Sequence, residues 1–540
     1  MDVFNNVLIL YCASEPIDRT GQVESESRDM KTVFVLFDSL NLKALESYGY
    51  DSILTPNFKR FAERAVTFES HYVGSLPCMP ARRDMHTGRL NFFHRSWGPL
   101  EPFDNSFAAI LGRNGVYTHL VSDHYHYWED GGAVYHNRYD TWEFIRGQER
   151  DKWKAMVEPP MDRFRRDFHP SQFTEGRESD GRLQNMINRE YMKEEADYCC
   201  PRTFKHGIEF LDVNRNANNW LLHIETFDPH EPFSAPARFR EPYKTGYTGP
   251  VFDWPRYKRV SETPEEIAEL RANYAALVTM CDEYFGRLLD YFDQHDMWKD
   301  TAIVLTTDHG LLLSEHEWWG KNRMPFFEEI ARIPLMIYHP QYAAHGGQRR
   351  KSLTQTIDIM PTLLDMHGVA RPPHVQGHSL LPLLAEETKL RDVAVFGMFG
   401  GATNVSDGRY TYFRYPQDMT KQELWEYTLM PLRNHSLFAK ADFAGTTLHE
   451  GFAFTDGVPV MRVAARRNPA DQPIGHVASW TYDDCVTALY DLDADPEQNN
   501  PIRDPAVEAR LERAMVAVME AHEAPPEAYS RIDLAQGAPS

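Results

Sequence analysis

Short apolar runs alternate with amphipathic stretches along the first two thirds of the chain. In Pro264–Phe292 the apolar side chains recur every three to four positions, which is typical of a helix that packs on one face. The apolar runs are unbroken and rich in β-branched residues, which is typical of strands buried on both faces of a parallel sheet. The clearest predicted strands are Thr32–Phe37, Tyr117–Val121, Trp220–Ile224 and Thr301–Leu305. The alternation predicts an α/β domain with a large central, mostly parallel sheet flanked by helices.

The pattern changes after about residue 385. Strands are still predicted, but in a less regular context, and a helix follows them; these elements are 393–399, 409–415, 487–492 and 505–523. A smaller C-terminal α+β domain fits this pattern. The predicted organisation is a peripheral N-terminal extension (1–29), a main α/β domain (30–385) with a charged insertion over its site (142–200), and the C-terminal domain (386–540).

Composition narrows the classes of partner. The 540 residues carry 57 basic and 79 acidic side chains, a net charge of −22, which argues against nucleic acid or an anionic membrane as partner. The six cysteines form no C-x-x-C pair and are sparse for a disulfide scaffold. No apolar run reaches the roughly 20 residues of a membrane-spanning helix, and the short run at 7–12 lacks the basic flank of a signal peptide. We therefore expect a cytoplasmic protein.

Each of the four predicted strands is followed by side chains that can do chemistry. These are Asp38, the run Asp123-His124-Tyr125-His126, the run Asp228-Pro229-His230, and the run Asp308-His309-Gly310. The carboxyl ends of parallel strands meet at one edge of a sheet, where ligands bind in such folds. Four such groups predict a functional site at that edge.

The segment Cys78-Met79-Pro80-Ala81-Arg82 adds a candidate nucleophile. Pro80 suits the first turn of a helix, so Cys78 is expected at the helix N-cap, beside free backbone N–H groups that attract anions. Arg82, four residues on, is expected on the same helical face, where it adds a fixed positive charge.

This segment resembles the C-x-P-x-R signature of the sulfatase family, within the alkaline phosphatase superfamily. Other segments resemble further motifs of that family, including W-G-K and D-P-H-x-P-[FY]: Phe37–Leu40, Asp228–Phe233, Thr307–Gly310, Trp318–Lys321, Asp358–Leu364 and Tyr490–Pro496. The resemblance spans almost the whole chain and lies close to arylsulfatases and phosphonate monoester hydrolases. It implies hydrolysis of sulfate esters, with the cysteine converted after synthesis to formylglycine by a formylglycine-generating enzyme. The hydrated aldehyde is then the nucleophile, and unmodified Cys78 or a serine lacks its route for releasing sulfate.

The resemblance also implies the roles of individual residues. Asp38, Asp308 and His309 supply two oxygens and a nitrogen to one divalent cation, and modified Cys78 completes the ligand set. Besides Arg82, the catalytic and substrate-binding groups are expected to be His124, Tyr125, His126, His230 and Lys321. Either His230 or Lys321 is suited to protonating the leaving group. The substrate is a small ester, and a homo-oligomer is expected.

Two departures from the family pattern matter. Many sulfatases carry two acids after the first strand, whereas the second position here is Ser39. Loss of one carboxylate leaves the metal open between Mn²⁺ and Ca²⁺, with a slight preference for Mn²⁺ because an imidazole is among its ligands.

The second departure concerns the family segment G-Y-x-T-x-x-x-G-K-x-H. Without a gap, Asp123 and Tyr125 occupy the Lys and His positions of that segment; with a shift of one residue, His124 and His126 do. An aspartate facing sulfate is repulsive, so the shifted register is preferred. In that register His126 is the base that removes a proton from the sulfated hydrate, so that sulfate is expelled and the aldehyde is restored. Tyr125 remains an alternative hydrogen-bond donor to the substrate.

Three alternatives remain at this stage. A phosphonate monoester or phosphodiester hydrolase on the same scaffold shares both departures and also acts on a monoanion. A two-metal phosphatase or mutase is disfavoured, because only one metal site is evident and Cys78 stands where a hydroxyl residue is expected. A non-catalytic member of the family would be expected to have lost the candidate catalytic residues, whereas this sequence retains them.

Overall fold

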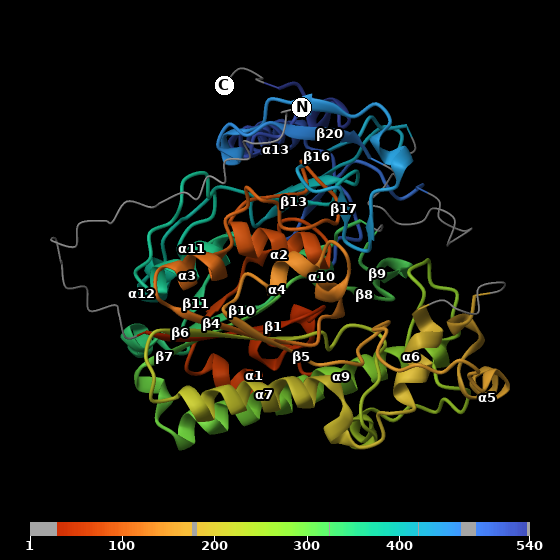
Figure 1. Cartoon of the computed structure of the whole chain (residues 1–540). Helices are drawn as coiled ribbons and strands as arrows, with labels where there is room; N and C mark the ends of the chain where they lie inside the picture. The colour runs from red at the N-terminus through yellow and green to blue at the C-terminus, as the bar shows by residue number, and fades with distance from the viewer. Residues whose placement is uncertain (1–29, 175–180, 323–324, 420, 466–481, 537–540) are drawn as a thin grey trace, which may run out of the picture.

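The computed structural model describes residues 30–174, 181–322, 325–419, 421–465 and 482–536, so the predicted extension at 1–29 lies outside the described residues. An eight-stranded sheet forms the centre of the molecule (Figure 1). Its strands in spatial order are β11 (Arg349–Arg350), β2 (Val66–Phe68), β10 (Leu335–Tyr338), β7 (Thr301–Thr307), β1 (Lys31–Phe37), β6 (Trp220–Thr226), β4 (Tyr117–Ser122) and β5 (Thr141–Phe144). All neighbours pair in parallel except β10, which is antiparallel to both β2 and β7.

Helices cover both faces of this sheet. One layer consists of α1 (Pro56–Ala62), α7 (Cys199–Asn214) and α9 (Pro264–Gln294), and the other contains α2 (Cys78–Thr87), α3 (Phe107–Arg113) and α11 (Ile359–Met366) (Figure 1). Alternate residues of β1 serve the two layers: Val33 and Val35 pack in the first core, and Phe34 and Leu36 in the second. Because both faces are buried, the strand is a continuous apolar run rather than an alternating one.

The register of the central strands aligns their carboxyl ends. Phe37, the last residue of β1, pairs with Thr226 of β6 and with Thr307 of β7, and Ser122 of β4 pairs with Glu225. The polar segments that follow these strands therefore emerge at one edge of the sheet, as the sequence predicts.

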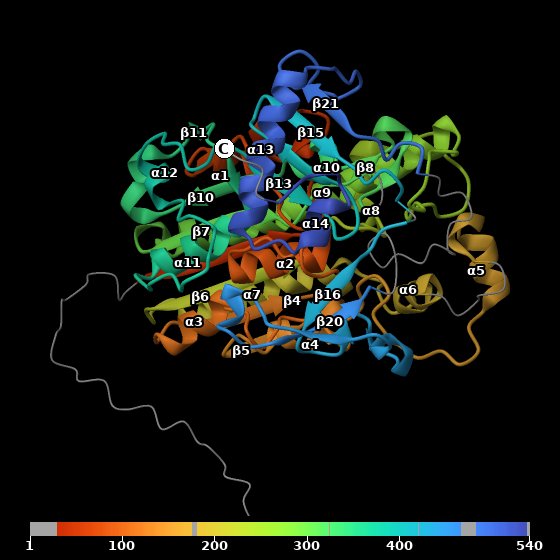
Figure 2. The same cartoon turned by 90° about the horizontal axis from the view of Figure 1, so that it is seen from above.

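A second, smaller unit follows in the chain. Its antiparallel sheet comprises β13 (Ala394–Gly397), β14 (Thr403–Ser406), β15 (Tyr410–Arg414) and β21 (Ala488–Asp491), with α13 (Pro505–Ala521) and α14 (Pro526–Ser530) packed on it (Figure 2). A three-stranded sheet, β16 (Trp425–Thr428), β20 (Val460–Ala464) and β19 (Thr447–His449), and the hairpin β17 (Leu432–Arg433) to β18 (Ser436–Leu437) complete it. The predicted fold class is confirmed, whereas the domain boundaries stay a prediction.

This unit lies on the α2 side of the central sheet and supports the start of α2 (Figure 1). The backbone N–H of Leu76 donates to the carbonyl of Gly397 at 2.8 Å, and Ser75 forms a parallel bridge with Gly397. The two residues before Cys78 are Leu76 and Pro77. The C-terminal sheet therefore fixes the backbone that leads into the helix carrying the candidate nucleophile.

The insertion at 142–200 stays a prediction, like the other domain boundaries. Its first residues belong to β5 of the central sheet, and its last two begin α7. Between them, α5 (Met161–Asp167) and α6 (Gly181–Arg189) lie to one side of the sheet in both overall views (Figures 1 and 2). Gln148 reaches the predicted site edge, since its Nε2 donates to Asp228 Oδ1 at 2.8 Å.

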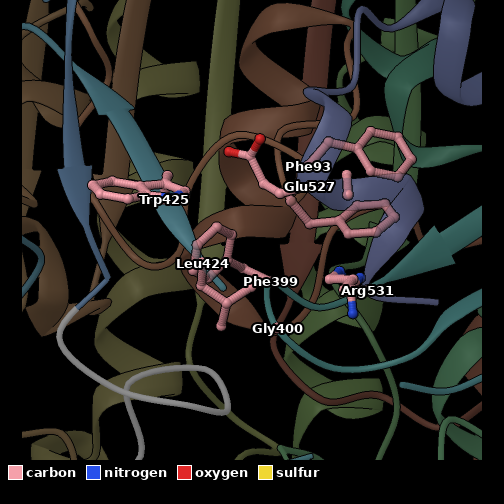
Figure 3. Close-up of a pocket in the computed structure, with 9 residues that line it drawn as sticks. Phe93, Phe399, Gly400, Leu424, Trp425, Glu527 and Arg531 are labelled. Carbon is pink, nitrogen blue, oxygen red and sulfur yellow. The ribbon is translucent and has the colours of Figure 1, made fainter. Parts of the chain in front are cut away.

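Shorter elements complete the fold. The helices are α4 (Ala133–His136), α8 (Ala237–Arg240), α10 (Glu328–Ala331) and α12 (Leu381–Ala385), and the strands β3 (His71–Tyr72), β8 (Leu312–Leu313), β9 (Trp319–Gly320) and β12 (Thr354–Gln355). A small pocket lies between the two units, lined by Phe92, Phe93 and Phe399 together with Trp425 and Arg531 (Figure 3). Within the described part of the chain, every helix is too short or too polar to cross a bilayer.

Candidate active site

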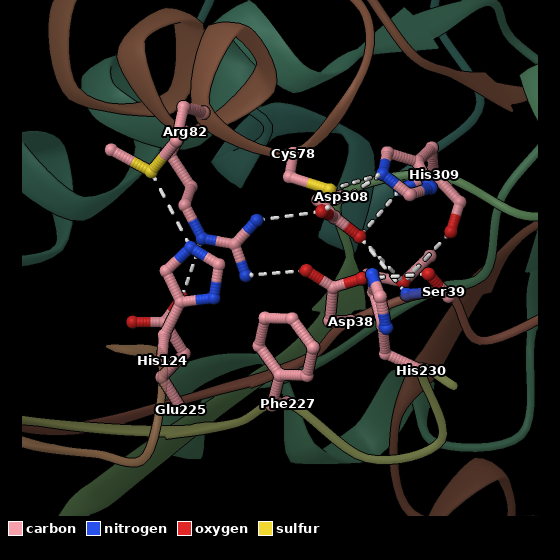
Figure 4. A network of polar contacts seen from close by, with 12 residues as sticks. Asp38, Ser39, Cys78, Arg82, His124, Glu225, Phe227, His230, Asp308 and His309 are labelled. Carbon is pink, nitrogen blue, oxygen red and sulfur yellow. Dashed lines mark hydrogen bonds and ion pairs between the residues drawn. The ribbon is translucent and has the colours of Figure 1, made fainter. Parts of the chain in front are cut away.

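Four ligand-type side chains meet at the carboxyl ends of β1 and β7. Asp38 follows β1, Asp308 and His309 follow β7, and Cys78 is the first residue of α2. Their ligand atoms all lie within 4.8 Å of one another, and all four residues are buried (Figure 4). The structure thus brings together the four residues that the sequence predicts as metal ligands.

The helix that carries Cys78 begins one residue earlier than predicted. Pro77 is the N-cap and Cys78 the first helical residue, so the N-cap role predicted for Cys78 is wrong by one position. Pro80 lies in the first turn, where a missing N–H has no cost because those groups lack intrahelical acceptors.

His309 presents one defined ring edge to Cys78. Its Nδ1 donates to the carbonyl oxygen of Gly310 at 3.0 Å, which leaves the lone pair on Nε2. Nε2 lies 3.2 Å from Cys78 Sγ and 3.2 Å from Asp308 Oδ2. Burial and the neighbouring Lys321 charge hold the pKa of His309 well below its ordinary value. The ring is therefore neutral, which is the form that binds a metal.

Arg82 is surrounded by three carboxylates. Its Nε lies 2.6 Å from Glu225 Oε1, its Nη1 lies 2.6 Å from Asp308 Oδ2, and its Nη2 lies 3.0 Å from Asp38 Oδ2. The side chain is 1 % exposed. The fixed positive charge that the sequence predicts at Arg82 is balanced by these carboxylates, and through Asp38 and Asp308 it positions two of the candidate metal ligands. The catalytic role of Arg82 stays a prediction.

Lys321 is the second cation of the cluster. It donates to Ser39 Oγ at 2.5 Å and lies 3.4 Å from Asp38 Oδ1, while Ser39 Oγ in turn donates to Asp38 Oδ1 at 2.6 Å. Burial opposes ionisation of Asp38, but Lys321 and Arg82 nevertheless hold its pKa well below the ordinary value. Asp38 is therefore a carboxylate in this site, and Ser39, which replaces the family's second acid, links it to Lys321.

Gly320 lets Lys321 reach this position. Its φ of 107° is in the region that favours glycine, and a Cβ there would lie 2.5 Å from the Tyr257 ring. The Tyr257 hydroxyl donates to Glu231 Oε1. Tyr257 therefore packs against the strand that presents Lys321 and fixes the carboxylate next to His230.

His230 lies on the Asp38 side of the cluster (Figure 4). Its Nδ1 donates to the backbone oxygen of Glu231 at 2.5 Å, and its ring packs on Phe227 with 4.1 Å between centroids. Burial raises the pKa of Asp38, whereas Lys321, Arg82 and, to a smaller extent, His230 lower it. The predicted proximity of His230 to the cluster is thus observed.

His124 lies beside Arg82 (Figure 4). Its ring stacks on Phe227 with 5.0 Å between centroids, and its Nε2 lies 3.3 Å from Met79 Sδ. Burial and the Arg82 charge hold the pKa of His124 well below its ordinary value. A neutral His124 is therefore part of the wall of the site.

Tyr125 and His126 have their polar contacts elsewhere. Tyr125 is buried, and its pKa is raised by burial and by Glu149, to which its hydroxyl is hydrogen-bonded. His126 Nδ1 lies 2.6 Å from Glu129 Oε2. These contacts with Glu149 and Glu129 do not test catalysis. The base role predicted for His126 and the donor role predicted for Tyr125 therefore stay predictions.

Sequence reasoning missed two residues of the site, Glu225 and Tyr257. Glu225 lies inside the buried strand β6 and is fully buried. A carboxylate within an apolar strand requires a cationic partner, so its position was a usable signal. No comparable signal marks Tyr257, which reaches the site from a loop.

The residues present fit a divalent metal. Two carboxylates and one neutral imidazole form a mixed O,O,N ligand set of the kind that transition metals accept. Asp38 Oδ2 is buried and has an ion-pair distance to Arg82 but no hydrogen bond of good geometry in the described chain, so it retains ligand capacity. Asp38, Asp308 and His309 would hold the ion, next to Cys78.

Comparison with known families assigns the chain. Residues 31–369 match the sulfatase family, and residues 314–449 match the family described as N-sulphoglucosamine sulphohydrolase, C-terminal. The chain belongs to the sulfatase family. This sulfatase is an enzyme that hydrolyses sulfuric esters, and its family implies a metal ion and a cysteine modified to formylglycine.

Relatives of this sulfatase have several named activities. An N-acetylglucosamine-6-O-sulfatase from Bacteroides thetaiotaomicron is 23% identical over 481 residues, which cover 78% of this chain and 85% of the relative. An arylsulfatase K from Canis lupus familiaris is 32% identical over 426 residues, which cover 73% of each chain. A phosphonate monoester hydrolase of Agrobacterium radiobacter has a similar structure, with a TM-score of 0.62 at 18% identity over 91% of this sulfatase and 96% of the other chain.

Proposed function

We propose that this sulfatase cleaves its ester with a formylglycine nucleophile made from Cys78, beside one divalent metal held by Asp38, Asp308 and His309. The observation that carries the proposal is the convergence of these four ligand atoms within 4.8 Å at the start of α2. Burial and Asp38 raise the pKa of the Cys78 thiol well above its ordinary value. A buried thiol of this kind is a poor nucleophile, which supports the converted aldehyde rather than the thiol as the reactive group.

A divalent ion held by Asp38, Asp308 and His309 would supply Lewis acidity, which would polarise the ester and lower the pKa of the attacking hydroxyl. The cationic groups of the chain complete this environment. Burial opposes the charge on Lys321, but the neighbouring carboxylates of Asp38 and Glu231 help to raise its pKa above the ordinary value, so it stays protonated. Its ammonium is suited to binding an equatorial sulfate oxygen as charge develops there.

His230 is suited to protonating the leaving oxygen. Its Nδ1 is held by the Glu231 carbonyl, which leaves the Nε2 edge for the substrate. Phe227 supports the ring, so the proton donor has a fixed direction. His124 contributes a neutral wall beside Arg82.

A second activity, hydrolysis of phosphonate monoesters or phosphodiesters, is supported by Ser39. Ser39 replaces a carboxylate, and its hydroxyl joins Lys321 to Asp38. A site with one fewer negative charge accepts either monoanionic ester. We propose it as a promiscuous activity of the same site.

The proposal is tested on the full-length protein in two steps. Mass spectrometry of the Cys78 peptide is expected to show the aldehyde or its hydrate instead of the thiol. Turnover of an aryl sulfate is then compared with that of a phosphonate monoester, with Cys78→Ala as the inactive control. Unmodified Cys78 in protein that still turns over either ester would contradict the mechanism, and faster turnover of the phosphonate would reverse the order of the two activities.

Maturation and cellular context follow from the same proposal. Conversion of Cys78 needs a formylglycine-generating enzyme as a transient partner. Cys199, Cys200 and Cys281 are buried and form no disulfide with one another, which supports a cytoplasmic location. We further propose a homo-oligomer, which light scattering on the purified protein tests directly.

A further inference from the structure

A second group of potential ligands lies outside the cluster around Cys78. It consists of His126, Glu129 and His435, whose ligand atoms lie within 4.8 Å of one another. Glu129 Oε2 lies 2.6 Å from His126 Nδ1 and 2.5 Å from His435 Nδ1. Two imidazole nitrogens from distant parts of the chain therefore converge on a single carboxylate oxygen.

Local structure explains why two of these residues share one side of the chain. Residues Tyr125–Trp128 form a 3-10 turn after β4, and Glu129 is its C-cap. In such a turn residues three apart are eclipsed, so His126 and Glu129 project together. The third member, His435, lies in the tight turn between β17 and β18 of the C-terminal domain.

Neighbouring groups hold the three side chains in place. Asn434 Nδ2 donates to Glu129 Oε2 at 3.0 Å, and the backbone N–H of Gly131 donates to the Asn434 carbonyl at 3.0 Å. The Trp97 ring packs against both imidazoles, with centroid distances of 5.5 Å to His126 and 5.4 Å to His435. Supporting contacts of this kind orient the ligands of metal sites.

Burial across the group is graded. His126 is 5 % exposed, the Glu129 side chain is 25 % exposed, and the His435 side chain is 54 % exposed. One side of the group is thus enclosed by protein and the other is open to solvent. Solvent therefore reaches the group from the His435 side.

We propose that His126, Glu129 and His435 form a second cation site, for a divalent ion of the zinc class, that joins the C-terminal domain to the turn after β4. Two imidazoles and one carboxylate are a ligand set that zinc accepts with a fourth position open, whereas Ca²⁺ and Mg²⁺ prefer oxygens throughout. Ligands about 2.0–2.1 Å from tetrahedral zinc lie about 3.3 Å apart. The carboxylate of Glu129 therefore has to withdraw from the two rings by less than about 1 Å.

The site borders the catalytic wall. The His126 ring lies 4.2 Å from that of Tyr125 and 5.2 Å from that of His124, measured between centroids. An ion bound at Nδ1 fixes the His126 ring edge that faces Glu129, and it orders the turn that also carries His124. This structural role of the second ion is separate from the ester hydrolysis proposed above.

The test counts metal on the full-length protein. After treatment with a chelator, each protein is dialysed against a small excess of Zn²⁺, and bound zinc per chain is measured by plasma mass spectrometry. His435→Asn and Glu129→Gln are each expected to bind one equivalent less than the wild type. The matched control is His374→Asn, an exposed histidine at φ 64°, where asparagine is tolerated; it is expected to keep the wild-type content.

The comparison between variants isolates this site. Zinc at the Asp38 cluster is the same in all four proteins, so it cancels in the difference. Added Zn²⁺ is also expected to raise the melting temperature of the wild type more than that of His435→Asn. Wild-type zinc content in either His435→Asn or Glu129→Gln would overturn the three-ligand site, without bearing on the proposed function.

Discussion

Arg82 Nη1 lies 2.6 Å from Asp308 Oδ2, so the arginine of the C-x-P-x-R segment binds a carboxylate of the proposed metal site. The same guanidinium contacts Asp38 and Glu225. A fixed planar cation can orient three carboxylates at once, which a flexible lysine cannot. The residue four positions after Cys78 is therefore a positioning residue that builds the ligand set from one helix and two strands.

Loss of this cation is expected to destabilise the fold. Arg82→Met leaves three buried carboxylates without their partner, at a cost of about 3–5 kcal/mol in the free energy of unfolding. Urea unfolding of chelator-treated protein measures it. Arg163→Met removes a solvent-exposed ion pair with Glu190 and is expected to lower the free energy of unfolding much less than Arg82→Met does. Equal effects of the two substitutions would show that the buried network is not needed for stability.

Replacement of the candidate nucleophile is expected to abolish turnover with little effect on folding. Cys78→Ser retains a hydroxyl but cannot form the hydrate, so kcat for an aryl sulfate should fall by at least about 10³-fold. Cys199→Ala alters a buried cysteine of α7 and should keep kcat within about threefold of the wild type. A Cys78→Ser enzyme with wild-type turnover would rule out the formylglycine route.

Removal and exchange of the metal test the role of Ser39. Chelation is expected to abolish ester turnover, with Mn²⁺ restoring it better than Ca²⁺ because the ligand set includes an imidazole. Ser39→Asp returns the second acid at φ 63°, which aspartate tolerates, and should raise the relative recovery with Ca²⁺. Full activity of the metal-free protein would contradict the need for a metal. The same relative recovery with Mn²⁺ and Ca²⁺ in the wild type and in Ser39→Asp would contradict the role given to Ser39.

Lys321 is expected to stabilise charge that develops on the ester in the transition state. Lys321→Met removes the ammonium next to Asp38, and kcat should fall by about 10²–10³-fold, as for other groups that stabilise developing charge. Lys351→Met, at an exposed lysine, is the matched control and should leave kcat unchanged. A rise in KM alone would instead indicate that Lys321 contributes uniform binding.

A buried pair of carboxyl groups makes stability depend on pH. Burial raises the pKa of Asp228 to about 7, and burial and Asp228 raise the pKa of Asp123 well above its ordinary value. The folded chain thus binds these protons more tightly than the unfolded chain, so their stabilising contribution is present near pH 4 and is lost as pH rises through about 7.

The substitution Asp123→Asn should remove much of this dependence. Relative to the wild type, its free energy of unfolding is expected to rise by roughly 1–3 kcal/mol between pH 5 and pH 8. Denaturant unfolding at several pH values measures the difference. Asp51→Asn, at an exposed aspartate, should show no such change, and a constant difference for Asp123→Asn would show that the pair is ionised throughout.

Much of the fold follows from local pattern. The predicted strands at 32–37 and 301–305 match β1 and β7, and the predicted helix at 264–292 matches α9, each to within two residues at either end. These elements are readable because a strand buried on both faces must be apolar throughout, and an amphipathic helix must repeat every 3.6 residues. The insertion at 142–200 was harder, because β5 is a short edge strand with exposed residues.

The sequence by itself determined the chemistry at the strand ends: Asp38, Asp308 and His309 follow parallel strands, and parallel register brings such residues to one edge. Only the tertiary structure decided how charges pair within that edge. Arg82 meets Glu225, and His126 meets His435, through contacts between residues far apart in the chain. Periodicity reports which face of an element is buried, whereas the partner of a buried charge depends on how separate elements pack together.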